Sequence, residues 1–218
     1  MKTIIKLENI VKTYVQGKLK VNALRGISLD IDKGEFTAIS GPSGSGKTTL
    51  LNIIGGLDKP TEGKIFIDKQ NIVELKESDL ATLRLNKIGF VFQAYNLVPV
   101  LSAFENVELV LALQGVPKTQ RKEKVEKILE EVGLADLIHR RPVDMSGGQQ
   151  HRVAVARAMV SKPKLILADE PTANLDSKTG ASLLDMMHEL NRNYKVTFLF
   201  STHDPMVMEH SGRIIESV

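Results

Sequence analysis

The sequence predicts an α/β fold in which a mostly parallel β-sheet is interrupted by a block of helices. Four short apolar segments each run directly into polar residues, namely FTAIS, IGFVF, LILA and VTFLFS. The last three are near-continuous apolar runs, which are typical of parallel strands covered on both faces. Residues 94–160, between the second and third segments, instead have the pattern of helices.

The remaining elements follow from local patterns. IIKLENI and ISLDIDKG read as strands, so we expect an N-terminal antiparallel β subdomain. KIFID, KIGFVF and KLILAD are further strands. Helices are expected in TTLLNIIGGL, FENVELVLALQ, RKEKVEKILEEV, GGQQHRVAVARAMV and SKTGASLLDMMHELNRN. We interpret the chain as a single domain over 1–218, with an α/β core at 1–93 and 161–218 and a helical insert at 94–160.

Composition excludes several classes of protein. The 218 residues are 42% hydrophobic and 25% charged, which is ordinary for a globular chain with a full core. The net charge of +3 is small and spread out, and we expect no nucleic-acid partner. The absence of cysteine excludes disulfides and thiolate metal sites, and His139 and His151, which lack metal-ligand spacing, are interpreted as surface or structural residues. The first residues predict neither a signal peptide nor a membrane anchor.

A glycine-rich loop follows the first apolar segment. GPSGSGKT matches the pattern G-x-x-x-x-G-K-[ST] and lies between a predicted strand and a predicted helix, as a phosphate-binding loop requires. In such a loop backbone N–H groups surround the phosphates, Lys47 reaches the β- and γ-phosphates, and Thr48 can hold Mg²⁺. An ordinary glycine-rich turn is the alternative. The motif favours a P-loop NTPase core, with nucleotide contacts from Gly41, Pro42, Ser43, Gly44, Ser45, Gly46, Lys47, Thr48 and Thr49.

LILADE places two carboxylates at the end of another strand. Asp169 suits a metal site, and Glu170 follows where a base for an attacking water would be needed. The alternative is a surface acid pair that opens a turn before Pro171. Because ligands of open α/β sheets bind beyond the carboxyl ends of the strands, these acids and the glycine-rich loop are expected at one edge of the sheet.

Three further residues are individually weak candidates. Gln93 and His203 each follow an apolar strand, where a lone Gln or His is more often a satisfied structural group. Their common placement on the same sheet edge is what favours a functional role. Tyr14 could stack on a nucleobase or pack in the core.

A second glycine motif precedes the helix that starts near residue 147. In MSGGQQ a serine and two glycines stand at a helix N-terminus, where exposed N–H groups and the helix dipole favour an anion. The alternative is a tight turn before a helix. The candidate phosphate contacts are Ser146, Gly147, Gly148 and Gln149.

Together, GPSGSGKT, MSGGQQHRVAVARA, LILADEPTANLD and STHD resemble the ATP-binding subunit of an ABC transporter, over essentially the whole chain. The resemblance implies ATP and Mg²⁺ as ligands. It implies that Tyr14 stacks on adenine, that Gln93 senses Mg²⁺ and communicates with a membrane partner, and that Glu170 is the catalytic base. Asp176 matches the D-loop aspartate, and His203 matches the residue that contacts the γ-phosphate. The implied catalytic set is Lys47, Gln93, Glu170 and His203, and the implied metal set is Thr48, Gln93 and Asp169.

The resemblance also implies why one chain carries two phosphate motifs. In this family two subunits meet head to tail, and the serine–glycine turn of each closes over the ATP held by the other. The implied partners are a second copy of the chain, integral membrane permease subunits and, as a further candidate, a periplasmic or extracellular adaptor. The implied location is the cytoplasmic face of the cell membrane.

GGLDKPTEG, IGFVFQAYNLVPVLSAFENVEL and DEPTANLDSKTG are similar to a narrower branch, that of the lipoprotein-release, macrolide-export and cell-division ATPases (LolD, MacB and FtsE types). This implies a Mg²⁺-ATPase that drives an export or mechanical-transmission permease. The rival function is a regulatory switch that gates an extracellular enzyme through its membrane partner. Two residues depart from the usual pattern: Met145 stands where Leu is usual and His151 where Gln is common.

Overall fold

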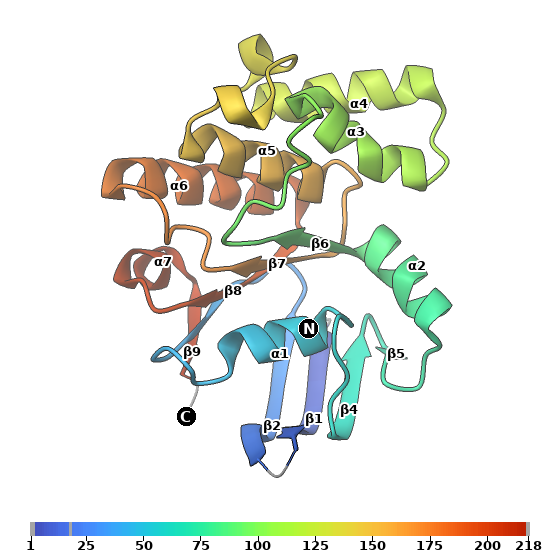
Figure 1. The fold of residues 1–218 in the computed structure, drawn as a ribbon, viewed down its shortest axis with the longest axis vertical. Helices are drawn as coiled ribbons and strands as arrows, with labels where there is room; N and C mark the ends of the chain where they lie inside the picture. The colour runs from blue at the N-terminus through green and yellow to red at the C-terminus, as the bar shows by residue number, and fades with distance from the viewer. Residues whose placement is uncertain (1–2, 18, 217–218) are drawn as a thin grey trace.

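A computed structural model describes residues 3–17 and 19–216, and it confirms the predicted fold class. Figure 1 shows the parallel sheet across the middle of the molecule, with α1 (Lys47–Ile54) below it and the longer helices above it. The strand order is β6-β7-β8-β3-β9, and each neighbouring pair runs parallel. The bounds are β3 (Phe36–Ser40), β6 (Ile88–Val91), β7 (Leu165–Asp169), β8 (Thr197–Thr202) and β9 (Arg213–Glu216).

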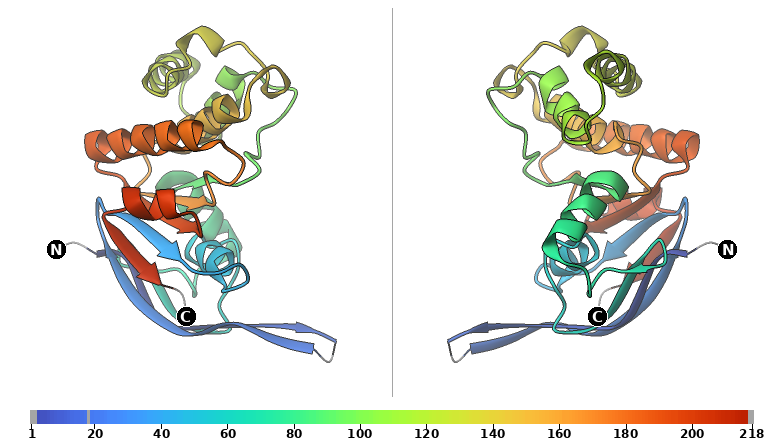
Figure 2. Two further views of the ribbon diagram at one scale, coloured as in Figure 1. Left: turned by 90° about the vertical axis from the view of Figure 1, so that its left-hand side faces the viewer. Right: turned by 90° about the vertical axis from the view of Figure 1, so that its right-hand side faces the viewer.

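The N-terminal sheet is antiparallel, as predicted, but its hairpin is longer than the apolar pattern indicates. β1 (Thr3–Gln16) lies between β2 (Leu19–Asp32) and β4 (Glu62–Ile67), and the short β5 (Gln70–Asn71) pairs with β4. Among the side chains of β1 that the structure describes, the last buried one is Ile10, yet backbone pairing with β2 continues to the end of the strand. Figure 2 shows this outer part of the hairpin projecting from the molecule as an arm.

Within the described residues, four other α-helices and β-strands are absent from the sequence expectations: β5, α2 (Glu77–Lys87), α7 (Pro205–His210) and β9. α2 buries only Leu80 and Leu83, so its sequence carries no continuous apolar stripe. β9 is a short edge strand without a fully buried residue. Both α2 and β9 form against an existing layer rather than from a strong local pattern.

The parallel sheet separates two hydrophobic cores, which explains its near-continuous apolar strands. In β8, Phe198 and Phe200 face the core on the side of α5 (Gly147–Met159) and α6 (Ser177–Tyr194). Leu199 between them faces the core on the side of α1. β7 alternates in the same way, with Ile166 on the first side and Leu167 on the second. Successive side chains of a strand point to opposite faces, so a sheet covered on both faces needs apolar residues at every interior position.

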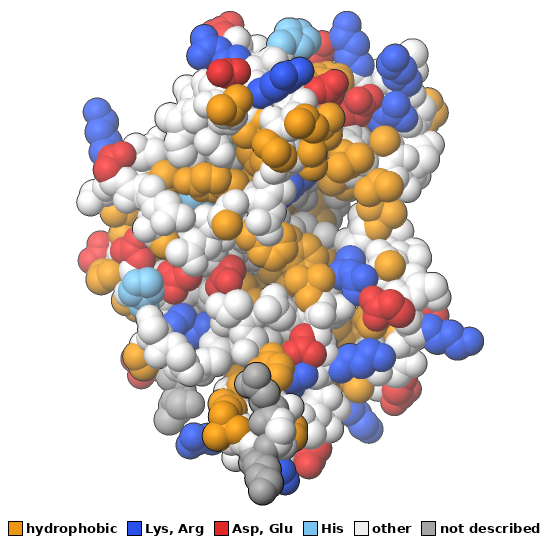
Figure 3. Space-filling view, viewed as in Figure 1, with side chains coloured by type: hydrophobic (Ala, Val, Ile, Leu, Met, Phe, Trp, Pro, Cys, Tyr) orange, Lys and Arg blue, Asp and Glu red, His pale blue; other side chains and the backbone are white. Residues whose placement is uncertain are grey.

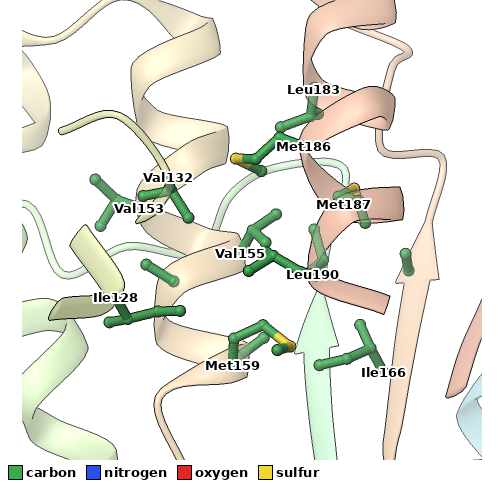
Figure 4. Packing of buried hydrophobic residues seen from close by; sticks show 14 of the residues in the cluster. Ile128, Val132, Val153, Val155, Met159, Ile166, Leu183, Met186, Met187 and Leu190 are labelled. Carbon is green, nitrogen blue, oxygen red and sulfur yellow. The ribbon is translucent and has the colours of Figure 1, made fainter. Parts of the chain in front are cut away.

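The helical layer is built around α5 (Gly147–Met159). Its neighbours are α3 (Ala103–Leu113), α4 (Lys118–Glu131) and α6 (Ser177–Tyr194), with short 3₁₀ turns at Ala135–Leu137 and Pro142–Asp144. Figure 4 shows Val153 facing α4, and Val155 and Met159 pointing toward α6 and β7. On β6, a Cβ added at Gly89 would lie 2.6 Å from the carbonyl oxygen of Ala158, so only glycine lets α5 approach this closely.

The segment between β6 and α3 is held by one buried amide. Asn106 of α3 is 1% exposed, and its Oδ1 accepts a hydrogen bond from the Val98 N–H at 2.8 Å. Its Nδ2 lies 3.1 Å from the carbonyl oxygen of Val98 and 3.0 Å from those of Leu101 and Ser102. The amide therefore provides donors and acceptors for a loop that has no regular pairing of its own.

Asn106→Ala is expected to lower the free energy of unfolding by about 1–3 kcal/mol, because it leaves buried backbone groups without partners. Urea denaturation followed by circular dichroism measures this. Asn86→Ala is the matched control, since Asn86 is also a helical asparagine but is exposed, and it should change stability by less than about 0.5 kcal/mol. Equal effects of the two substitutions would contradict this role for Asn106.

Candidate functional site

The predicted site residues follow four strands whose carboxyl ends share one edge of the parallel sheet. The register places Ser40 of β3 opposite Thr202 of β8, and Asp169 of β7 opposite Ser201 of β8. β6 lies on the other side of β7, with Val91 opposite Ala168. The glycine-rich loop, the two acids, His203 and Gln93 each continue from one of these ends.

The glycine-rich loop has the backbone that its sequence requires. Gly44 and Gly46 have φ values of +82° and +89°, and a Cβ at Gly46 would lie 2.5 Å from the carbonyl oxygen of Ala23. Lys47, the first residue of α1, is buried, and its Nζ donates to the carbonyl oxygens of Gly41 at 2.7 Å and Pro42 at 2.9 Å. The ammonium therefore lies across the loop, where phosphate oxygens could replace the two carbonyls.

The residues predicted to hold a metal are partly assembled. Thr48 Oγ1 donates to Asp169 Oδ1 at 3.0 Å, and the Ser201 hydroxyl donates to the same oxygen. Within the described residues, no group of three or more His, Cys, Asp or Glu side chains could hold a metal ion. The Thr48 hydroxyl and the Asp169 carboxylate are oxygen ligands of the kind that Mg²⁺ takes, usually one or two from the protein, with water and substrate phosphates completing its octahedral shell.

Glu170 and His203 form a hydrogen-bonded pair. Glu170 Oε1 lies 2.7 Å from His203 Nδ1, and Glu170 Oε2 accepts a hydrogen bond from Thr202 Oγ1 at 3.4 Å. Glu170 has a φ of +47°, which is uncommon for a residue with a side chain, and its N–H donates to the Ser201 carbonyl oxygen at 3.0 Å. The carboxylate is 14% exposed and the imidazole 59% exposed, so the pair lies at the surface of the edge with His203 outermost.

Two further predicted residues lie at the neighbouring turns. Gln93 is exposed just after β6, and its carbonyl oxygen accepts a hydrogen bond from Asn174 Nδ2 at 3.2 Å. Asp176 is the N-cap of α6 and accepts from the Thr179 N–H at 3.0 Å and the Thr179 hydroxyl at 2.6 Å. These Thr179 hydrogen bonds lower the pKa of the Asp176 carboxyl.

The second glycine motif begins α5. Ser146 Oγ accepts from the Gln149 N–H, and the Gln149 side chain accepts from the Ser146 N–H at 2.9 Å, which is a capping box. A Cβ at Gly147 would lie 2.9 Å from the Tyr95 hydroxyl, and one at Gly148 would lie 2.5 Å from a Thr179 methyl. In Figure 1 the layer that contains α5 lies above the parallel sheet, whereas α1 lies below it. The two glycine motifs are thus attached to opposite sides of the sheet.

His151 and Tyr95 join this motif to the segment after β6. His151 is fully buried, its ring centroid is 4.3 Å from that of Tyr95, and neither ring nitrogen has a hydrogen-bond partner among the described residues. Burial lowers its pKa to about 4, so it is neutral near pH 7. The surface interpretation of His151 is therefore wrong, and the structural one holds. Arg157, also on α5, donates to the carbonyl oxygens of Tyr95 and Asn96.

Tyr14 does not pack in the core. It lies on the projecting part of β1 and is 42% exposed, and the side chain of Thr49 on α1 is a neighbour of its hydroxyl. This position contradicts packing in the core and leaves the ring accessible for stacking on a nucleobase.

Several contributing residues were not identified from the sequence. Ser201 and Thr202 could have been found, since hydroxyl residues at the end of an apolar strand next to candidate acids are suited to hold them. Asn174 and Arg157 donate hydrogen bonds to backbone carbonyl oxygens that are far away in the sequence. No local sequence pattern marks such contacts.

The comparisons with known proteins agree with this geometry. The sequence profile of the ABC transporter family matches residues 24–173. An uncharacterized ABC transporter ATP-binding protein of Thermotoga maritima is 47% identical over 215 residues, which are 99% of this chain and 92% of that protein. A macrolide export ATP-binding/permease protein of Syntrophobacter fumaroxidans is 46% identical over 97% of this chain, which corresponds to 30% of that protein's length.

A solved structure gives the same result. The ATP-binding cassette MJ0796 of Methanocaldococcus jannaschii, solved as a dimer bound to ADP and Pi, matches with a TM-score of 0.90. The match is 44% identical in sequence and covers 98% of this chain and 94% of that one. Among the helices of the described residues, none has both the length and the apolar character needed to cross a bilayer. By sequence and by fold, the chain belongs to the ABC transporter ATP-binding family.

Proposed function

We propose that this ATPase subunit drives an export permease, and that ATP binding closes two copies of the chain into a dimer. The observation that carries the proposal is the convergence of the glycine-rich loop, the Thr48–Asp169 pair and the Glu170–His203 pair at one edge of the sheet. The macrolide export relatives, which combine an ATP-binding part and a permease in one chain, favour transport over a regulatory switch. The substrate class we propose is a lipoprotein, macrolide or peptide.

Hydrolysis would be an in-line attack of water on the γ-phosphorus. Glu170 would orient the water and accept its proton, while the bond from the γ-phosphorus to the bridging oxygen breaks and ADP leaves. His203 directs Nδ1 toward Glu170, which leaves Nε2 for a γ-phosphate oxygen. Lys47 would exchange its carbonyl partners for β- and γ-phosphate oxygens. Thr48, Asp169 and Gln93 would hold Mg²⁺, which supplies charge neutralisation on these phosphates.

The dimer is proposed because a single chain separates its two phosphate motifs. The P-loop begins α1 on one side of the sheet, and the Ser146 turn begins α5 on the other. A second copy in a head-to-tail arrangement would place its Ser146 turn over the ATP of the first. MJ0796, solved as a dimer bound to ADP and Pi, supports the association of two copies. We propose the boundaries 1–93 and 161–218 for the nucleotide-binding core and 94–160 for the helical part that carries this turn.

A groove between α2, α3 and α5 is the proposed contact with the permease. Figure 3 shows hydrophobic side chains gathered around a hollow on this face of the molecule. Arg84, Arg157 and Asn96 add polar groups to the lining. We propose that a short helix of the permease occupies it, which would hold the chain at the cytoplasmic face of the membrane. The main apolar lining residues are Leu57, Leu85, Phe90, Phe92, Val110 and Leu113.

Glu170→Gln should keep ATP binding and lower hydrolysis by about 10²–10⁴-fold, the usual contribution of a general base. Unhydrolysed ATP should then hold two chains together, which size-exclusion chromatography with and without Mg-ATP detects. Lys47→Ala in the same background is the control, and it should remain monomeric because it removes the charge that faces the phosphates. Hydrolysis at the normal rate by Glu170→Gln would place the base elsewhere.

Ser146→Arg, made in the Glu170→Gln background, should abolish the ATP-induced dimer while ATP affinity of the monomer stays nearly unchanged. Ser146 is exposed, so an arginine fits the isolated chain, at a cost of about 1 kcal/mol for the lost helix cap. Calorimetry measures monomer affinity and size-exclusion chromatography measures dimer formation. Ser78→Arg, on exposed α2, is the matched control and should still dimerise. Collapse of monomer binding would show that the turn serves the ATP of its own chain.

Leu113→Asp should weaken binding to the permease roughly tenfold, because it places a charge where an apolar contact of about 1.5–3 kcal/mol is proposed. The measurement is the fraction of full-length chain that sediments with membranes of the source cells. Leu113 is 66% exposed, and Val143→Asp, at a position 79% exposed outside the groove, is the control. ATPase activity of both purified variants should be unchanged. Normal sedimentation of Leu113→Asp would exclude this groove as the contact.

A further inference from the structure

Charged residues contact the exposed Tyr14 side chain at its hydroxyl and on one face of its ring. Its hydroxyl donates to Asp58 Oδ2 at 2.7 Å, and the Nζ of Lys12 lies 4.7 Å from the ring centroid. Lys12 Nζ also lies 2.7 Å from Asp58 Oδ1 and donates to the Lys59 carbonyl oxygen at 2.7 Å. The three side chains of Lys12, Tyr14 and Asp58 form a closed triangle, which we call the Tyr14 clamp.

The clamp connects two parts of the molecule. Lys12 and Tyr14 are neighbours on one face of β1, two positions apart, in the projecting part of the hairpin. Asp58 belongs to the turn after α1, the helix that begins with Lys47 and Thr48 of the P-loop. The tyrosine ring is therefore fixed to the same helix that carries the phosphate site at its other end.

Within the clamp, the Tyr14 ring is more exposed than the two charged side chains, so a ligand can reach it. The Lys12 side chain is 12% exposed and that of Asp58 is 32% exposed, whereas Tyr14 is 42% exposed. Lys12 covers one face of the ring, so the exposed area includes the other face. Val21, the cross-strand partner of Tyr14, is 50% exposed and extends the apolar surface beside the ring.

A rigid ring is a better stacking platform than a mobile one. An exposed tyrosine loses rotamer freedom when a base stacks on it, and that loss subtracts from affinity. A ring that is already held by a hydrogen bond at its hydroxyl and a cation on its rear face has lost this freedom in advance. Burial and the Asp58 hydrogen bond both raise the pKa of the Tyr14 hydroxyl, so it remains a donor to the carboxylate.

We infer that Asp58 and Lys12 are positioning residues that hold the Tyr14 ring for a nucleobase and set its place relative to the P-loop. The inference rests on the proposed ATP site and adds the residues that hold the base-stacking ring in place. The opposing interpretation is that the clamp only anchors the hairpin to the core. If the clamp positions the ring, its loss lowers the affinity for the nucleobase. If the clamp only anchors the hairpin, its loss lowers the stability of the fold and weakens the binding of every ligand.

The test compares ATP with a ligand that has no base. Asp58→Ala and Tyr14→Phe should each raise the KM for ATP about fivefold, the effect of losing one hydrogen bond of ordinary net strength, with kcat unchanged. The inhibition constant of inorganic tripolyphosphate, which meets only the P-loop, should stay at its wild-type value. The double variant Asp58→Ala/Tyr14→Phe should be no worse than Asp58→Ala alone, because Asp58→Ala already removes the hydrogen bond that Tyr14→Phe removes, together with the Lys12 contact. Tyr14→Ala, which removes the platform, should raise KM by tenfold or more.

The outcomes separate this inference from the proposed function. If the wild-type chain neither binds nor hydrolyses ATP, the proposed function fails. If it does both and Asp58→Ala leaves KM unchanged, or weakens ATP and tripolyphosphate equally, the positioning role fails alone. Additive effects in the double variant, or an unchanged KM in Tyr14→Ala, would also overturn it. Thermal unfolding of each variant accompanies the kinetics, and a lowered unfolding temperature with unchanged KM supports the anchoring interpretation.

Discussion

Parallel pairing of β3, β6, β7 and β8 is the constraint on which the rest of the structure depends. Helices cover both faces of this sheet, so the interior positions of its strands are apolar and polar groups are confined to the strand ends. The register then decides which ends meet. The Thr48–Asp169 and Glu170–His203 contacts both join residues that follow different strands. A slip of one residue would exchange the two cores and separate these pairs at the same time.

The same sheet also separates the chain's two glycine motifs. One motif begins a helix below it and the other begins a helix above it. In the proposed dimer this separation has a consequence. A chain that held both groups on the same ATP would have no need of a partner, whereas a divided chain is complete only when ATP brings two copies together. The catalytic edge would then respond to association as well as to binding.

The sequence was sufficient for features that arise from local pattern or from strand ends. The four strand ends, the glycine-rich loop and the capped α5 are of this kind, because glycine at positive φ and uninterrupted apolar runs leave a direct mark on the sequence. Contacts between distant segments leave no such mark. Asp58 is separated from Tyr14 by 44 positions, and Arg157 from Tyr95 by 62. The hairpin length was missed for a related reason, since beyond Ile10 no described side chain of β1 is fully buried and the strand continues through backbone pairing with β2.

The buried His151, which stands where the family commonly has Gln, makes one of these contacts between distant segments. A histidine without hydrogen-bond partners is tolerated in the interior only when it is neutral, and its lowered pKa meets that condition. Its ring packs on Tyr95, while Arg157, further along α5, donates to the carbonyl oxygens of Tyr95 and Asn96. These contacts hold the segment that contains Gln93 against α5, the helix that Ser146 caps. Asn96 and Arg157 also line the groove proposed for the permease. A permease helix in that groove would touch Asn96 and Arg157, so it could act on the segment that contains Gln93 and on the Ser146 turn through one set of contacts.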